Sequence, residues 1–209
     1  MSLHTPHVVL IGDSTLDNGT YTGGAPDVVG NLASLLPSPW RATRCAIDGA
    51  TLKTLDRQLM AVPHDATHLI LSIGGNDALA HQDLFDRQVR TIGEAVGQLA
   101  ATVEQFEPAY RAALSSVMKL GKAVTVCTIY NGSFPDRAFQ RFATLAVSVF
   151  NDVIIRASSA TRIPIVDLRL ACNRPDHYVN SIEPSAAGGD RIARAIHASL
   201  KKSYPASNL

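Results

Sequence analysis

The feature that most constrains the fold is an alternation of short apolar runs with longer segments that have helical spacing. The runs are rich in β-branched residues and are continuous, which is typical of strands buried on both faces of a parallel sheet. They occupy residues 8–11, 67–73, 123–129 and 163–168, with a weaker run at 41–47. Helical spacing fills residues 27–36, 52–60, 86–120, 137–160 and 186–201. The alternation predicts a three-layer α/β sandwich of about five parallel strands, with any site at their carboxyl ends.

Length and charge narrow the class of protein. The chain has 209 residues with 19 Lys and Arg against 18 Asp and Glu, a formal net charge of +1. A chain of this length closes one core, so we expect a single domain over residues 1–209. The basic residues are scattered and form no stripe that would neutralise a phosphate backbone. We therefore expect no nucleic-acid partner.

The cysteines and the amino terminus bear on the compartment. Cys45, Cys127 and Cys172 are odd in number and far apart, a pattern that indicates neither a disulfide framework nor a zinc site. The amino terminus enters its first apolar run without the basic segment of a secretory signal, and no run approaches the 18 apolar residues of a membrane span. We expect a cytoplasmic protein with no membrane span, no metal and no cofactor.

Polar residues that could perform chemistry follow three successive predicted strands. The first strand runs into Gly12-Asp13-Ser14, with Asp17-Asn18-Gly19 close behind, which places a serine hydroxyl at the carboxyl edge of the sheet. The second ends at Asp48-Gly49-Ala50, where the Gly49 N–H can approach a ligand closely. The third ends in Gly74-Gly75-Asn76-Asp77, which supplies a side-chain amide donor. A nucleophile and oxyanion donors would meet at such an edge.

These three blocks resemble the SGNH or GDSL hydrolases (GDSL-like lipases and acylhydrolases), with matching order and spacing from residue 8 to about 200. The resemblance implies a flavodoxin-like sandwich and a serine that attacks an ester or thioester carbonyl of a small acyl substrate. It assigns the nucleophile to Ser14. It also assigns the oxyanion hole to the Ser14 N–H, the Gly49 N–H and the Asn76 side chain.

The fourth block of the family, Asp-x-x-His-Pro, is altered here. Residues 180–188 read Asn-Ser-Ile-Glu-Pro-Ser-Ala-Ala-Gly, so Asn180 occupies the acid position and Glu183 the histidine position. A glutamate has an ordinary pKa about 2 units below that of histidine, so Glu183 would be the weaker base. The following helix favours its ionised form, whereas burial would raise its pKa.

Other histidines were weighed as a substitute base. His177 is the only one near the fourth block, but a histidine in a surface loop is the favoured interpretation, because Asp176 beside it points the other way in an extended segment. We expect His64 and His68 to be solvated rather than metal ligands. We expect Asp17 to accept hydrogen bonds from nearby backbone amides in a turn.

Three functional hypotheses remain, and we place them in order. The first is an esterase with Ser14 as nucleophile and Glu183 as an atypical base, because a carboxylate can relay a proton in both directions. The second is a catalytically impaired binding protein that keeps the pocket without turnover. The third, a nucleotide binder, lacks both G-x-G-x-x-G and the P-loop motif.

Overall fold

The computed structural model describes residues 5–203 and contains a five-stranded sheet. All strand pairs are parallel, and the strand order is β2-β1-β3-β4-β5. This is the doubly wound, flavodoxin-like order, whose switch point lies where the chain turns from one side of β1 to the other. The strands are β1 (His7–Gly12), β2 (Arg41–Arg44), β3 (His68–Ser72), β4 (Ala123–Cys127) and β5 (Ile165–Val166).

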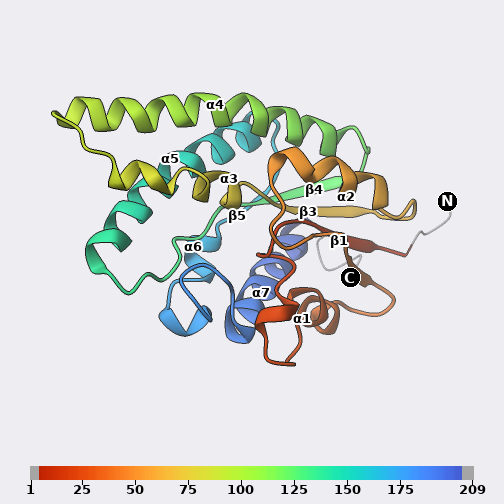
Figure 1. Cartoon of the computed structure of the whole chain (residues 1–209). Helices are drawn as coiled ribbons and strands as arrows, with labels where there is room; N and C mark the ends of the chain where they lie inside the picture. The colour runs from red at the N-terminus through yellow and green to blue at the C-terminus, as the bar shows by residue number, and fades with distance from the viewer. Residues whose placement is uncertain (1–4, 204–209) are drawn as a thin grey trace.

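Helices cover both faces of the sheet, as Figure 1 shows, so the predicted three-layer sandwich is confirmed. On one face lie α1 (Val28–Leu35) and α7 (Ala186–Ser203), which contact each other extensively. On the other lie α2 (Leu55–Ala61), α4 (Ile92–Met118) and α5 (Arg137–Ala160). Short elements complete the chain: α3 (Gly75–Leu79), α6 (Leu168–Ala171), and the 3₁₀ turns η1 (Gly19–Tyr21), η2 (Leu52–Thr54), η3 (Gln82–Asp86) and η4 (Pro175–His177).

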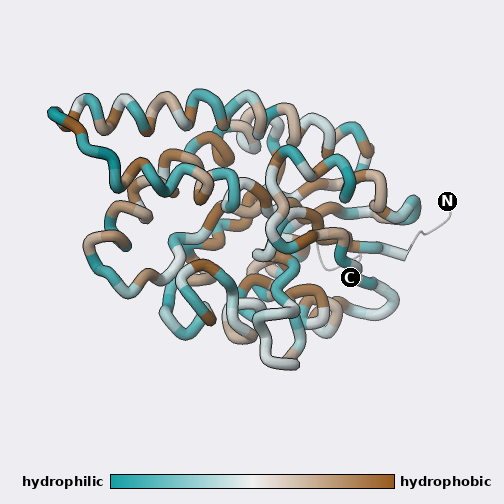
Figure 2. The backbone as a smooth tube through the Cα atoms, viewed as in Figure 1, coloured by the Kyte–Doolittle hydropathy of each residue, from teal (hydrophilic) through white to brown (hydrophobic). Residues whose placement is uncertain are grey.

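Each face of the sheet carries its own apolar core. Val8 and Leu10 of β1 point toward α1 and α7, whereas Val9 and Ile11 point toward α2, α4 and α5. All four side chains are fully buried. Figure 2 shows the resulting concentration of hydrophobic residues along the central strands. The continuous apolar runs in the sequence reflect this double burial.

The predicted elements differ from the structure mainly at their ends. The run at 163–168 forms only a two-residue strand, because Asp167 caps α6 by accepting a hydrogen bond from the Arg169 N–H. The long helical segment at 86–120 begins six residues later, at Ile92, where the Thr91 side chain accepts a hydrogen bond from the Glu94 N–H. Residues 87–91 form a loop, and the 3₁₀ turn η3 before that loop contributes to the cavity described below.

Among the described residues, only α5 has the length and apolar composition that would suffice to cross a membrane. In this fold, the apolar residues of α5 pack against the sheet and line a cavity. Phe150, Val153 and Ile154 in the second half of the helix are buried against the sheet. The first half, as described below, borders a cavity.

Candidate active site

The turn that carries Ser14 is anchored at the end of β1. Gly12 has a φ of 135°, and a Cβ there would lie 1.7 Å from the Ser72 carbonyl oxygen, so only glycine fits. The buried Gln58 side chain of α2 holds both polar groups of Gly12: its amide oxygen accepts from the Gly12 N–H and its amide nitrogen donates to the Gly12 carbonyl, each at 2.7 Å. Backbone bonds from Leu16 and Asp17 to the Asp13 carbonyl close the turn. Ser14 is therefore fixed, and it is 7% exposed.

Asp13, the residue before the serine, is a buried carboxyl that the sequence reasoning did not single out. Its Oδ1 accepts a hydrogen bond from the Thr15 N–H at 3.1 Å. Burial raises its pKa to about 7, against the opposing effect of the Thr15 hydrogen bonds, and the nearby Glu183 and Asp77 carboxyls raise it further. A carboxyl group with this pKa carries a proton at mildly acidic pH.

Asn76 lies in the first turn of α3, which begins immediately after β3. The chain enters α3 through Gly74 at a φ of 113°, and a Cβ at Gly74 would press on the Phe106 ring at 3.0 Å. The Asn76 Nδ2 donates to the Ala50 carbonyl oxygen at 2.9 Å. Because an amide nitrogen carries two hydrogens, this bond orients the group and leaves its second N–H available.

Gly49 lies in the turn that follows β2, with a φ of 75° and open space where a Cβ would be. This turn is tied to the serine turn, because the Asp48 N–H donates to Asp17 Oδ2 at 3.0 Å. Asp17 thus accepts from a backbone amide of the neighbouring strand end and pairs with Arg44, so the prediction of a local turn role for it is wrong. Within residues 5–203, neither the Ser14 N–H nor the Gly49 N–H has a hydrogen-bond acceptor.

The loop that precedes α7 brings Glu183 to the same edge of the sheet. Tyr178 and Pro184 form an antiparallel bridge, and the Val179 N–H donates to the Glu183 carbonyl at 3.0 Å. The Asn18 side chain donates to the Pro184 carbonyl at 3.3 Å, and the Tyr130 hydroxyl donates to the Ile182 carbonyl at 2.6 Å. The loop is therefore fixed by its own antiparallel bridge and by hydrogen bonds from Asn18 and Tyr130.

Glu183 faces Ser14. The carboxyl group is buried, with the residue 9% exposed, and its Oε2 has no hydrogen-bond partner within the described part of the chain. Burial raises the pKa of Glu183, and the Asp48 carboxyl adds to that rise, whereas a hydrogen bond from the Ser14 side chain lowers it. The helix that follows therefore does not dominate the pKa, and burial makes this carboxylate a stronger base than an exposed glutamate.

Asn180 and His177, the other two candidate residues near Glu183, do not act as the acid and base of a catalytic triad in this arrangement. Asn180 is exposed, and its Oδ1 accepts from the Ile182 N–H at 2.9 Å and the Glu183 N–H at 2.8 Å. It thus caps the turn that presents Glu183. His177 is buried at 6% exposure beneath α7, so the expectation of a surface histidine is wrong. The same error applies to His68, which is 5% exposed and stacks on Trp40 with ring centroids 5.5 Å apart.

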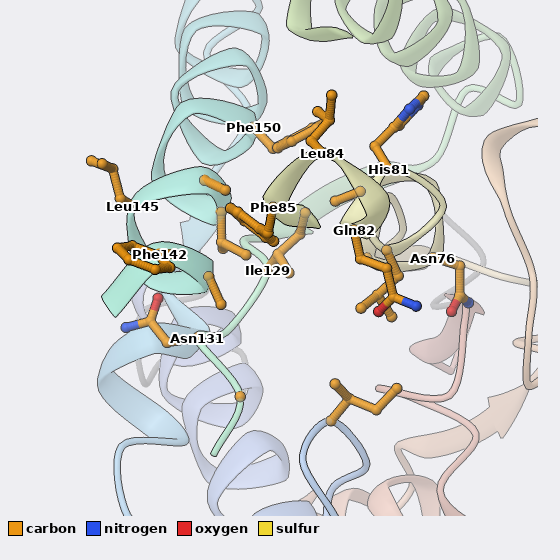
Figure 3. A pocket seen from close by; sticks show the side chains of 18 of the residues that line it. Asn76, His81, Gln82, Leu84, Phe85, Ile129, Asn131, Phe142, Leu145 and Phe150 are labelled. Carbon is orange, nitrogen blue, oxygen red and sulfur yellow. The ribbon is translucent and has the colours of Figure 1, made fainter. Parts of the chain in front are cut away.

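A cavity of about 410 Å³ opens from these residues toward α4 and α5. Ser14, Asn76 and Glu183 line one part of it. In Figure 3, Asn76 lies across the cavity from Phe142 and Leu145, and Phe85 and Ile129 lie between them. Gly49 and His177 do not line it. The sequence reasoning missed this cavity, although the i, i+3, i+6 spacing of Phe139, Phe142 and Leu145 indicates an apolar face on α5.

No three histidine, cysteine, aspartate or glutamate side chains within residues 5–203 gather as ligands for a metal ion. The site thus consists of a serine, a carboxyl group and amide donors.

Comparison with known proteins places the chain in a family. The model of the GDSL-like Lipase/Acylhydrolase family matches residues 10–191. No curated protein sequence matches the chain significantly.

Solved structures share the fold at low sequence identity. An extracellular lipase from Streptomyces rimosus superposes with a TM-score of 0.69 at 16% identity, covering 95% of this chain and 99% of the lipase. An acetylxylan esterase from Geobacillus stearothermophilus gives a TM-score of 0.70 at 19% identity, covering 96% of each chain. A phospholipase A1 from Streptomyces albidoflavus gives 0.69 at 16% identity, covering 94% of this chain and 99% of the phospholipase. With the family match over most of its length, the chain belongs to the GDSL-like lipase and acylhydrolase family, whose members in this comparison are esterases and lipases.

Proposed function

We propose that the protein hydrolyses an ester or thioester bond with Ser14 as nucleophile and Glu183 as general base. The observation that carries the proposal is the buried Glu183 carboxyl against the Ser14 hydroxyl, at the edge of a cavity that Asn76 also lines. A serine hydroxyl is a weak nucleophile until an adjacent base takes its proton. Glu183 is the group positioned to take it.

The reaction balances with these groups alone. As Ser14 Oγ bonds to the substrate carbonyl carbon, its proton passes to Glu183, and the charge on the carbonyl oxygen is stabilised by the Ser14 and Gly49 N–H groups and the free N–H of Asn76. Glu183 then returns the proton to the departing alcohol or thiol. In the second half, water attacks the acyl-serine and gives a proton to Glu183, and Glu183 passes this proton to Ser14 Oγ as the acid is released.

A fluorophosphonate probe tests the nucleophile directly, since it bonds to an activated serine oxygen with loss of fluoride. We expect the native protein to be labelled and Ser14→Ala not to be. Ser115→Ala, an exposed serine on α4, serves as the matched control and should label like the native protein. Equal labelling of the native protein and Ser14→Ala would refute the assignment.

A catalytically impaired binding protein is the second candidate, and one observation favours it. Within residues 5–203 no histidine makes a hydrogen bond to Ser14: His177 does not line the cavity, and His81, which does line it, makes none to the serine. The absence of labelling in a folded native protein, together with retained ligand binding, would support this candidate over the esterase.

A further inference from the structure

The cavity beside Ser14 is far more apolar than a site for an acetyl group needs to be. Its walls come from η3, the loop after β4, the first half of α4 and α5 as far as Phe150. Leu84, Leu99, Ile129 and Phe150 contribute aliphatic and aromatic surface away from the nucleophile. Its volume of about 410 Å³ falls within the range of pockets that enclose an organic ligand.

At its far end the cavity remains open to solvent. Val96 is 60% exposed, Phe142 53% and Leu145 65%, although all three line it. A chain longer than the cavity can therefore extend past these residues along an apolar rim.

Polar residues outside the cavity lie next to the turn that holds Ser14. Tyr21 donates its hydroxyl to Asp48 Oδ2 at 2.7 Å, and Asp17 pairs with Arg44. None of these four residues lines the cavity. The nucleophile thus lies near both an apolar cavity and an exposed polar surface.

We propose that the cavity binds the acyl chain of the substrate, and that the substrates are esters of medium- to long-chain fatty acids whose alcohol leaves over the polar side. This inference rests on the proposed serine hydrolase function. The acyl group stays bonded to Ser14 after the alcohol departs, and water must then reach the acyl carbon. A pocket that holds the chain, next to an open polar side for alcohol release and water entry, satisfies both requirements.

The hydrophobic effect sets the size of the expected preference. Each methylene moved from water into the cavity should raise kcat/KM about fourfold, which corresponds to about 0.8 kcal/mol. In a series of p-nitrophenyl acetate, butyrate, hexanoate and octanoate, with the leaving group constant, we expect kcat/KM to rise at each step until the cavity is filled. Ser14→Ala should abolish the whole series.

Filling the cavity sharpens the test. Ala146 lines it from α5, and Ala146→Trp should lower the octanoate-to-acetate ratio of kcat/KM at least tenfold. Ala101→Trp, at an exposed position of α4 outside the cavity, should keep the native ratio. If Ala146→Trp fails to fold, Ala95→Trp, on the exposed side of α4 and lining the same cavity, replaces it.

The outcomes separate the two proposals. A flat or falling chain-length series that still depends on Ser14 overturns the acyl-chain inference and leaves the hydrolase function intact. If no ester is hydrolysed, calorimetry with decanoate and acetate decides the inference: decanoate binding that Ala146→Trp weakens supports an acyl pocket, and equal or absent binding of both acids overturns it.

Discussion

The turn that holds Ser14 and the loop that holds Glu183 reach the same point by different means. The serine turn is held by contacts made within a few residues and by the Gln58 clamp on Gly12. The glutamate loop is held by residues distant in sequence, Asn18 and Tyr130 among them. Most of the bonds that shape this loop go to its backbone. The conformation of this loop therefore does not depend on the side chain at position 183. The residue there can be substituted without loss of the hydrogen bonds that hold the loop.

The largest expected effect comes from removing the base while keeping its shape. Glu183→Gln retains the size of the side chain but cannot accept the Ser14 proton, so kcat/KM should fall by about 10² to 10⁴. Steady-state kinetics on an ester that the native protein hydrolyses would measure it, with Glu104→Gln on the exposed face of α4 as the control.

The pH profile of the native protein follows from the same assignment. Glu183 must be ionised to act, so kcat/KM should rise with pH through its pKa, which burial raises above that of an exposed glutamate. A Glu183→Gln variant as active as the native protein would refute the assignment of Glu183 as the base.

The next effect lies on the oxyanion side of Ser14. If Asn76 is the oxyanion donor that we propose, Asn76→Ala removes an N–H that stabilises the developing charge and should lower kcat by about 10² to 10³ while changing KM little. The same change removes the bond to the Ala50 carbonyl, so thermal unfolding must show that the variant is folded. Unchanged turnover would place Asn76 in a purely structural turn.

Restoring the family residues tests whether the loop is a working variant or an impaired one. Asn180→Asp together with Glu183→His would supply an imidazole with an ordinary pKa near 6.5 and a carboxylate three residues earlier to orient it. An aspartate can still accept the two backbone N–H bonds that Asn180 accepts. If the native loop is impaired, turnover should rise about 10²-fold or more. A double variant slower than the native protein would show that the site is adapted to its glutamate.

The sequence was informative where contacts are local. Ser14, Gly49 and Asn76 lie two, five and four residues after the ends of β1, β2 and β3. The position of each strand end therefore predicts that each residue lies near the carboxyl edge of the sheet. Cys127, which lies in the apolar run at 123–129, is likewise buried on β4, at 1% exposure.

Where contacts are distant, the sequence was a poor guide. His177 is covered by α7, and a Cβ at Gly188 would lie 2.1 Å from the His177 carbonyl oxygen, a contact that only the folded chain creates. The cavity is likewise formed where η3, α4 and α5 converge, and no single segment encodes it. The burial that raises the pKa of Glu183 also results from contacts between segments that are distant in the sequence.

The smallest expected effect on turnover, and the sharpest contrast between the two carboxyls, concerns Asp13. Its pKa is about 7 in the folded protein because it is buried, whereas an unfolded chain has an ordinary aspartate. The folded state therefore binds the proton more tightly, and the free energy of unfolding should fall as pH rises from about 4 to about 7, then level off. The total is on the order of 4 kcal/mol at about 1.4 kcal/mol per pKa unit. Asp13→Asn keeps an oxygen for the Thr15 N–H but carries no charge, so chemical denaturation should show a smaller loss of stability over this range, and above pH 7 a variant more stable than the native protein. An unchanged pH dependence in the variant would mean that Asp13 is not the group that titrates, and the stability profile would then have to be traced to Glu183, by repeating it in Glu183→Gln.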